Sequence, residues 1–333
     1  MGSELFLFGL IAIALAFEFI NGFHDTANVV ATPIATRSLS PYQAIIIAAI
    51  FNFIGAYFST GVAKTITSGL FDTTFITHTL IAAALISAIG WNLLTWWLGI
   101  PSSSSHALIG SLIGAVIVGN GGLAAVKWTG LFNKVILPML LSPILALFVA
   151  LTIMIIMVLC LGKNKSPRKT NNFVRELQVL SASLLAFSHG SNDSQKTMAI
   201  ITLSLFSFGV IDSTSTIPNW VIITCAITMA AGTLSGGMKI IRTLSSRLAK
   251  LKPINGFSAE ISSGALILAA SHFGLPVSTT QAASGSIMGA GYMNSGINWP
   301  VVRSMVTAWV LTLPITAIIS GLVYQLMMHL VKS

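Results

Sequence analysis

The sequence predicts an all-α polytopic membrane protein: an inverted-topology repeat with two re-entrant helical hairpins and broken transmembrane helices. Hydrophobic residues make up 54% of the 333-residue chain and charged residues only 8%, a balance that a soluble domain with a water-facing surface cannot carry. A two-part polar signature occurs twice within apolar surroundings, and two short basic loops separate the apolar segments. The membrane spans, their orientation and a duplicated site follow from these three observations.

Basic residues gather in two short loops that flank a pair of apolar segments. Ten of the 17 Lys and Arg residues lie there: Lys163, Lys165, Arg168, Lys169 and Arg175 in the first loop, and Lys239, Arg242, Arg247, Lys250 and Lys252 in the second. By the positive-inside rule both loops face the cytoplasm, so the segments 176–210 and 219–238 between them run out and back. The net charge of +9 is therefore a signal of membrane topology, and we exclude nucleic acid as a partner.

The stretch 78–120 contains enough apolar residues for two helices, but Pro101 and four consecutive serines interrupt it. Whether this stretch makes two full spans or one re-entrant hairpin, the chain returns to the side of the membrane from which it started. The charge distribution therefore does not distinguish between the two. The corresponding stretch 258–297 is broken at Pro276. We therefore expect two re-entrant hairpins, whose hydroxyl-rich tips come from opposite faces of the membrane and meet near its midplane.

The number of crossings in the first half predicts that the two halves have opposite orientations. Spans at about 4–36, 42–62 and 130–161, together with the first hairpin, give three net crossings. Because three is odd, the second half is inserted upside down and both termini lie outside. We expect a first repeat at 1–162, a basic cytoplasmic linker at 163–173 and a second repeat at 174–333.

Short elements of the two halves align with each other. Gly99-Ile100-Pro101 matches Gly274-Leu275-Pro276 at an offset of 175 residues, and Gly110-Ser111 matches Gly285-Ser286 at the same offset. This regular spacing supports a repeat that includes both hairpins.

The first part of the duplicated signature places an acid among Gly and Asn in mid-span. Its two copies, 168 residues apart at the acid, are Asn21-Gly22-Phe23-His24-Asp25-Thr26-Ala27-Asn28 and His189-Gly190-Ser191-Asn192-Asp193. Gly, Asn and Asp are poor helix formers, so we expect unwound segments whose free carbonyls and side-chain oxygens make a cage for a small hard cation. The side chains expected in this cage are Asp25, Asn28, Asn192 and Asp193, with Asn21 in support. Either acid can instead bind a proton, cap a helix or pair with Lys196.

The second part of the signature is a proline followed by hydroxyls: Pro101-Ser102-Ser103-Ser104-Ser105-His106 and Pro276-Val277-Ser278-Thr279-Thr280-Gln281. Each run starts the second arm of a hairpin, so hydroxyls and free amides converge where the helix dipole is positive, and an oxyanion such as phosphate can bind. The expected contacts are Ser102, Ser103, Ser104, Ser105, His106, Ser278, Thr279, Thr280 and Gln281. An ordinary N-cap accounts for one or two of these hydroxyls, and His106 is as well explained as a packing residue.

Three further charged residues fall within apolar segments. Lys196 is either a phosphate contact or the counter-ion of Asp193, and we favour the counter-ion. Glu18 is expected near the membrane surface. Glu260 begins the second hairpin, where it either supports the site or pairs with Lys252.

The two cysteines, Cys160 and Cys225, lie far apart in apolar segments without a His or Cys at metal-ligand spacing. We therefore expect no disulfide, no structural metal and no cofactor.

These motifs resemble those of the inorganic phosphate transporter (PiT) family. The resemblance rests on the paired Gly-x-x-Asp elements and on the two tips, and it covers almost the whole chain. Trp91-Asn92 and Gly256-Phe257-Ser258-Ala259-Glu260 fit the same family. The chain departs from the family pattern at Gln281, where many members carry His, so His106 is the only imidazole at the two tips.

The resemblance implies a secondary active symporter, not an enzyme, that imports inorganic phosphate across the cytoplasmic membrane on a Na+ or H+ gradient. It also implies a midplane site, often a homodimer in the lipid bilayer, and phosphate that can travel as a complex with Mg2+ or Ca2+. Two alternatives stay open, a sulfate permease on the same scaffold and an uncoupled anion channel. Paired buried acids argue against the channel, because they repel a passing anion unless a cation neutralises them.

Overall fold

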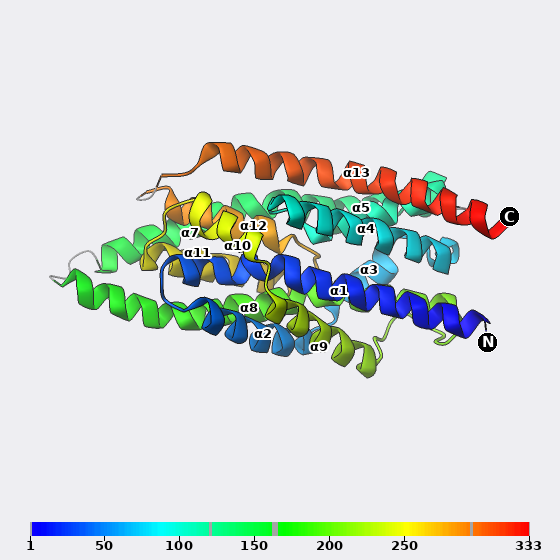
Figure 1. Ribbon diagram of the computed structural model, residues 1–333, viewed down its shortest axis with the longest axis horizontal. Coiled ribbons are helices and arrows are strands. Elements are labelled where there is room, and N and C mark those ends of the chain that lie inside the picture. The colour runs from blue at the N-terminus through cyan, green and yellow to red at the C-terminus, as the bar shows by residue number, and fades with distance from the viewer. Residues whose placement is uncertain (1, 120–121, 162–165, 294–295, 333) are drawn as a thin grey trace.

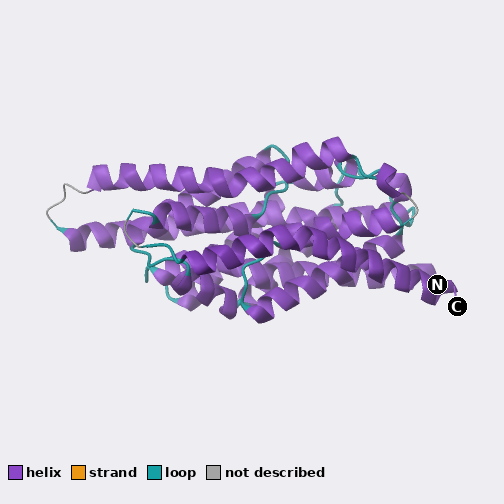
Figure 2. Ribbon diagram, turned by 90° about the horizontal axis from the view of Figure 1, so that it is seen from above, coloured by secondary structure: helices purple, strands orange, loops and turns teal. Residues whose placement is uncertain are grey.

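The computed structural model describes residues 2–119, 122–161, 166–293 and 296–332, and it is an elongated bundle of helices (Figures 1 and 2). In chain order the elements are α1 (Gly2–Ala35), α2 (Pro41–Phe58), α3 (Gly61–Gly69), η1 (Thr73–Phe75), α4 (His78–Leu98), α5 (Ser104–Val118), η2 (Gly122–Ala125), α6 (Trp128–Leu131), η3 (Phe132–Ile136), α7 (Leu137–Leu161), α8 (Pro167–Ser207), α9 (Asn219–Ser235), α10 (Met238–Arg242), η4 (Thr243–Arg247), α11 (Pro253–His272), α12 (Thr279–Gly291) and α13 (Trp299–Lys332). Lys163 and Lys165 of the first basic loop lie outside the described residues.

Helices cover the spans that the sequence predicts at 4–36, 42–62 and 130–161, while His78–Leu98, expected as one arm of a hairpin, is also long enough to cross a membrane. In the described part of the chain, five helices are long and apolar enough to cross a membrane: Glu4–Ala35, Pro41–Phe58, His78–Leu98, Trp128–Leu161 and Trp299–Leu330. Another pair, Asn219–Ser235 with Met238–Arg247, passes the same test together and is bent by 60° at its break. The short helix α3, which follows α2 after a turn, is not foreseen from the sequence.

Helix packing follows an inverted repeat, in which helices of the first half pack against helices of the second. α1 packs against α9 while its counterpart α8 packs against α2, and α5 packs against α13 while its counterpart α12 packs against α7. Gly99 and Gly274, at the ends of α4 and α11, have positive φ values of 68° and 66°. A glycine adopts this left-handed conformation without strain, so each hairpin turns at an equivalent residue. The all-α, repeated architecture expected from the sequence is confirmed.

The two hairpins open toward opposite ends of the bundle. Figure 1 shows α4 and α5 in the half that holds the start of α1 and the end of α13, and α11 and α12 in the other half. The tips meet between these halves, where the Ser105 hydroxyl donates to the Val277 carbonyl at 3.3 Å. The start of α8 and the basic helix α10 lie in the half away from the termini, so the described residues of the two basic loops share one end.

The prediction of unwound segments at 21–28 and 189–193 is wrong, because α1 and α8 remain helical through both motifs. Their glycines serve close packing instead. A Cβ at Gly22 would lie 2.5 Å from the Met229 carbonyl oxygen, and one at Gly190 would lie 2.1 Å from that of Asn52. Small residues let neighbouring helices approach closely in a membrane, where lipid supplies no hydrophobic drive for association. The interrupted helix is found elsewhere, at the bend between α9 and α10.

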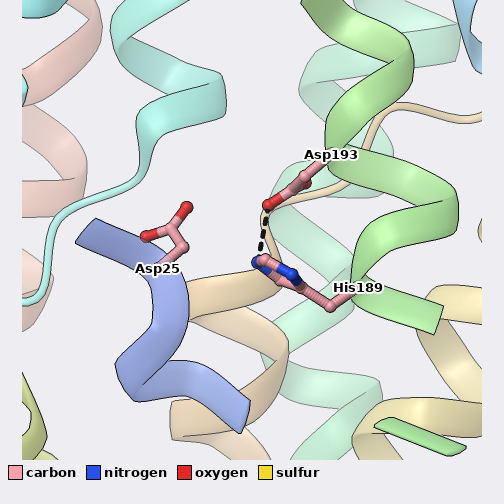
Figure 3. Close-up of side chains that lie close together, drawn as sticks. All are labelled: Asp25, His189 and Asp193. Atoms are coloured by element: carbon pink, nitrogen blue, oxygen red, sulfur yellow. Dashed lines mark ion pairs between the residues drawn. The ribbon is translucent and has the colours of Figure 1, made fainter. Parts of the chain in front are cut away.

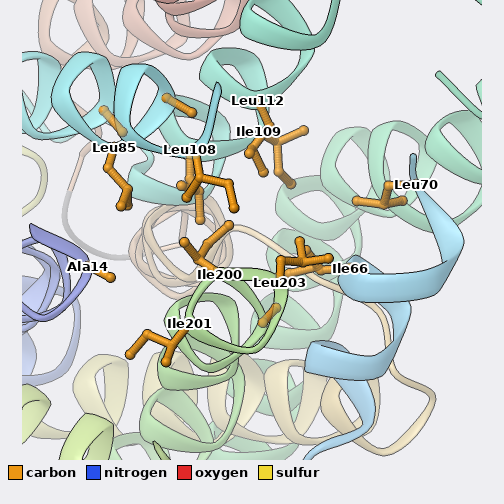
Figure 4. Packing of buried hydrophobic residues seen from close by; sticks show 14 of the residues in the cluster. Ala14, Ile66, Leu70, Leu85, Leu108, Ile109, Leu112, Ile200, Ile201 and Leu203 are labelled. Carbon is orange, nitrogen blue, oxygen red and sulfur yellow. The ribbon is translucent and has the colours of Figure 1, made fainter. Parts of the chain in front are cut away.

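A buried apolar core surrounds the first hairpin. Figure 4 shows side chains from several helices interdigitating: Ala14, Ile66, Leu70, Leu85, Leu108, Ile109, Leu112, Ile200, Ile201 and Leu203. The outer surface is apolar as well, with large exposed side chains on α7 and α13 that include Leu140, Phe148, Val310 and Ile318. An apolar exterior around a bundle with polar groups inside is the pattern of a protein whose solvent is lipid.

Substitution of Gly114 tests the close contact between α5 and α13. A Cβ at this position would lie 1.9 Å from the Ala317 carbonyl oxygen, whereas a Cβ at Gly90 on α4 meets nothing within 4 Å. We expect Gly114→Ala to cost about 1–3 kcal/mol through overpacking, and Gly90→Ala to be neutral or to gain up to about 1 kcal/mol of helix propensity. Thermal unfolding in detergent, followed by size-exclusion chromatography, measures both. Equal melting temperatures for the two variants would contradict the close crossing.

Candidate functional site

Two buried acids and a histidine face each other at the centre of the bundle. Asp25 comes from α1, and His189 and Asp193 come from α8 (Figure 3). One ligand atom from each of the three lies within 4.8 Å of those of the other two, and all three side chains are at most 1% exposed. His189 Nε2 lies 3.1 Å from Asp193 Oδ2, and His189 Nδ1 lies 3.0 Å from the side-chain oxygen of Asn52. Side chains alone make this centre, since the helices here are unbroken.

The hairpin tips satisfy these acids with hydroxyl groups. Ser104 donates to Asp25 Oδ2 at 2.6 Å, and Thr279 donates to Asp193 Oδ2 at 2.8 Å. Ser104 and Thr279 are equivalent residues of the two tips, 175 positions apart. Thr280 from the second tip also donates to Asp25 Oδ1, at 3.3 Å, so the tips contact acids of both repeats.

Two of the predicted anion contacts are helix caps. The Ser103 hydroxyl accepts from the His106 amide at 3.1 Å, and the Ser278 hydroxyl accepts from the Gln281 amide at 3.3 Å. The N-cap interpretation therefore describes these two equivalent serines. Ser102 donates instead to the Thr95 hydroxyl at 2.8 Å, which ties the tip back to α4.

Lys196 is the expected counter-ion of Asp193. Its ammonium forms an ion pair with Asp193 and also donates to the Ser105 hydroxyl and to the Val277 carbonyl. The side chain is 1% exposed, so its charge is compensated entirely within the protein.

His24 and Asn28 complete the environment of Asp25. His24 Nδ1 lies 2.8 Å from Asp25 Oδ1, and its Nε2 lies 3.2 Å from the Thr95 hydroxyl. Asn28 donates to the Thr280 hydroxyl at 2.9 Å. Among the described residues, the first acid therefore has a histidine and hydroxyl groups beside it, whereas the second has a histidine, a hydroxyl group and a lysine.

Several buried polar atoms around the acids have no hydrogen-bond partner. They include both side-chain polar atoms of Asn21 and the side-chain oxygens of Asn28 and Asn192. Asn192 uses its other atom to donate to Ser271 at 3.0 Å. Because buried polar groups are almost always paired in proteins, this excess of unused oxygens fits a site that receives a polar ligand or ions.

His106 and Gln281 point away from the acids. Helix geometry places His106 about 200° around α5 from Ser104, and both residues line a cavity of about 310 Å³ between α7 and α13, with Pro143, Trp309 and others. The ring nitrogens of His106 have no hydrogen-bond partner. Of the nine predicted anion contacts, these two side chains lie farthest from the role expected of them.

Glu260 and Glu18 are both fully buried, and the surface position expected for Glu18 is wrong. Glu260 accepts from Thr32 at 2.6 Å and Gln178 at 2.8 Å, as well as from Ser181, and makes no described contact with Lys252. The pairing considered with Lys252 is therefore wrong, since three hydroxyl and amide donors from α1 and α8 satisfy the carboxylate. Glu18 accepts from Thr197 at 2.5 Å.

Sequence reasoning missed two residues that support the centre. Asn52 holds His189 and also donates to Thr233 at 2.9 Å, and Thr95 joins His24 to Ser102. Both are polar residues within apolar helices, and a polar residue in such a segment is the sequence feature that could have identified them.

An inverted repeat with two helical tips that meet over buried acids defines a class of protein, the secondary transporters with a central composite site. Comparison with known proteins agrees. The model of the phosphate transporter family matches residues 21–320, and the chain belongs to this family.

Relatives match over nearly the whole chain. A Mycobacterium tuberculosis protein described as "Probable low-affinity inorganic phosphate transporter" is 46% identical over 330 residues, which cover 98% of this chain and 79% of that protein. A Bacillus subtilis protein with the same description is 46% identical and covers 95% of both chains. A solved structure named "The sodium-dependent phosphate transporter" superposes with a TM-score of 0.90 at 23% identity, covering 97% of this chain and 99% of that one. The chain is thus a multi-pass membrane phosphate transporter of the PiT family.

A double-mutant cycle tests the buried pair of Asp193 and Lys196. Removing one partner leaves an uncompensated buried charge, so we expect Asp193→Asn or Lys196→Met alone to cost about 3–5 kcal/mol of stability. The double variant should lose less than the sum of the two, with a coupling of about 1–3 kcal/mol. Unfolding midpoints in detergent measure the cycle, and additive losses would show that the pair is not coupled.

Proposed function

We propose that the protein is a symporter that imports inorganic phosphate and holds it between the two hairpin tips. The observation that carries this proposal is the convergence of Ser104, Thr279 and Thr280 on the paired acids. Ser105 lies next to Ser104 and is bonded to Lys196 and to the Val277 carbonyl. Each tip begins a helix, α5 or α12, whose first amides and positive dipole end favour an anion. Hydroxyls and amides offer phosphate many donors with little fixed positive charge, so the anion can be released on the other side.

The remaining tip residues act on this site through the backbone and through one another. Ser103 and Ser278 cap α5 and α12, and the amides of His106 and Gln281 hold these caps. Ser102 fixes the first tip to α4. We propose that these residues set the shape of the phosphate site and that the hydroxyls named above contact the anion.

The coupling cation binds at the acids in the same proposal. Asp25 and Asn28 supply oxygens in the first repeat, and Asp193 and Asn192 are their neighbours in the second. Na+ is supported by the described name of the solved relative, "The sodium-dependent phosphate transporter". A proton is the alternative, because either carboxylate can accept one. Loading of cation and phosphate together lowers the cost of moving between outward-open and inward-open states.

The orientation of the chain belongs to the proposal as well. The end of the bundle with the basic loops faces the cytoplasm by the positive-inside rule, the hairpins are re-entrant, and both termini lie outside the cell membrane. The family resemblance extends the proposal to phosphate bound to Mg2+ or Ca2+ and to a homodimer.

Uptake of labelled phosphate into proteoliposomes tests this function. A Na+ gradient and a pH gradient are imposed separately on the native chain, on Asp25→Asn and on Asp193→Asn. We expect one gradient to drive uptake by the native chain and both variants to lose the gradient-driven component. Asp25→Asn removes a carboxylate that can hold the cation, and Asp193→Asn leaves the buried Lys196 without its ion-pair partner. Arsenate should compete with phosphate, and sulfate should not.

The same assay distinguishes the rival functions. Phosphate flux that does not depend on either the Na+ gradient or the pH gradient would indicate an anion channel. Sulfate uptake that phosphate fails to inhibit would indicate a sulfate permease.

Alanine substitutions separate the tip hydroxyls from other buried serines. Ser104→Ala and Thr279→Ala each remove one donor to a charged group, worth about 1.5–3 kcal/mol, so we expect the apparent phosphate affinity to fall about ten-fold or more. Ser111, on α5 but without a hydrogen-bond partner, provides the matched control. Concentration dependence of uptake gives the values, and an unchanged affinity in both tip variants would remove the hydroxyls from the phosphate site.

A further inference from the structure

The two repeats differ at one chemically important position beside the acids. At the offset of 168 residues that relates Asp25 to Asp193, Asn28 in α1 corresponds to Lys196 in α8. Their contacts correspond too. Asn28 donates to Thr280, and Lys196 donates to Ser105, the equivalent hydroxyl of the other tip. A neutral amide in one repeat therefore stands where a permanent cation stands in the other.

The Lys196 ammonium occupies a set of oxygens that would suit a small hard cation. Its partners are the Asp193 carboxylate, the Ser105 hydroxyl and the Val277 carbonyl. These are the kinds of oxygen ligand that hard cations take in proteins. The ammonium is fully buried and bonded on all sides within the bundle, so nothing from solvent is needed to compensate its charge.

The first repeat keeps the oxygens but has no lysine. Asp25 and the Thr280 hydroxyl lie together, and the side-chain oxygen of Asn28 is buried and unpartnered. The Asn28 amide and the Asp25 carboxylate share the Thr280 hydroxyl as a partner, which places both side chains at one site. The two positions thus have similar oxygen ligands. They differ in the source of the positive charge, which the protein itself provides only at Lys196.

We propose that Lys196 is a tethered cation that permanently fills the cation position of the second repeat, so that only the first repeat, at Asp25 and Asn28, loads a mobile coupling ion. The inference rests on the proposed symport and adds its stoichiometry. Lys196 offsets the charge of Asp193, and a single mobile cation offsets that of Asp25, next to His24.

Substitution of Lys196 can convert the second repeat into a copy of the first. Lys196→Asn places an amide beside Asp193, as Asn28 stands beside Asp25, and removes the charge of the lysine. This variant should therefore gain a site for Na+. Lys196→Met removes the charge without supplying an oxygen and is the matched control. Asn28→Lys is the reciprocal change, which should fill the mobile site with a second tethered cation.

Binding of ²²Na+ to the purified chains measures the site count directly. We expect Lys196→Asn to bind one Na+ more than the native chain. Lys196→Met keeps the Asp193, Ser105 and Val277 oxygens but lacks the amide oxygen, so it should bind the added Na+ more weakly than Lys196→Asn. Where uptake by the native chain depends on Na+, the Hill coefficient should rise from about one to about two in Lys196→Asn, since it is bounded by the number of sites. Asn28→Lys should abolish the dependence of uptake on the imposed cation gradient.

Equal Na+ counts for the native chain and Lys196→Asn, in preparations that are monodisperse, would overturn the proposal. Should Lys196→Asn fail to fold, a persistent cation dependence in Asn28→Lys would overturn it instead. Failure of the native chain to transport phosphate would refute the proposed function separately, because the Na+ counts do not depend on transport.

Discussion

The burial of two carboxylates at the meeting point of the hairpin tips is the constraint on which this structure depends. A charge in the interior of a membrane protein is tolerated only where other groups compensate it. Here Ser104, Thr279 and Thr280 donate to Asp25 and Asp193, and Lys196 forms an ion pair with Asp193. The tips must therefore reach the centre from both ends of the bundle, which fixes the hairpins, the turns at their glycines and the exchange of packing partners between repeats.

The same contacts connect packing to transport. Each acid is bonded to a tip, so displacement of a tip breaks hydrogen bonds to a charge unless an ion or phosphate replaces them. The acids lie on α1 and α8, which cross α9 and α2 at the close contacts of Gly22 and Gly190. The tip helices α5 and α12 are packed as closely, at Gly114 against α13 and Gly289 against α7. The polar contacts between the tips and the acids therefore lie between closely packed helices.

Much of the fold was accessible from the sequence, because hydropathy, charge asymmetry and the repeated tips each act through simple physical rules. The hairpins, the spans and the pairing of Lys196 with Asp193 were predicted in this way. The continuity of α1 and α8 was not, since Gly22 and Gly190 can either break a helix or admit a neighbour, and only tertiary contacts decide between these roles. The partners of Glu260 and the direction of His106 also depend on how helices rotate about their axes, which sequence spacing does not determine.

The location of the anion is the central claim, and a structure with bound arsenate tests it most directly. Arsenate has the shape and charge of phosphate, and its anomalous scattering identifies the arsenic atom in a crystal. The account predicts a peak between the first turns of α5 and α12, within hydrogen-bond reach of Ser104, Ser105, Thr279 and Thr280. A peak in the cavity of His106 and Gln281 between α7 and α13, with none between the tips, would contradict it.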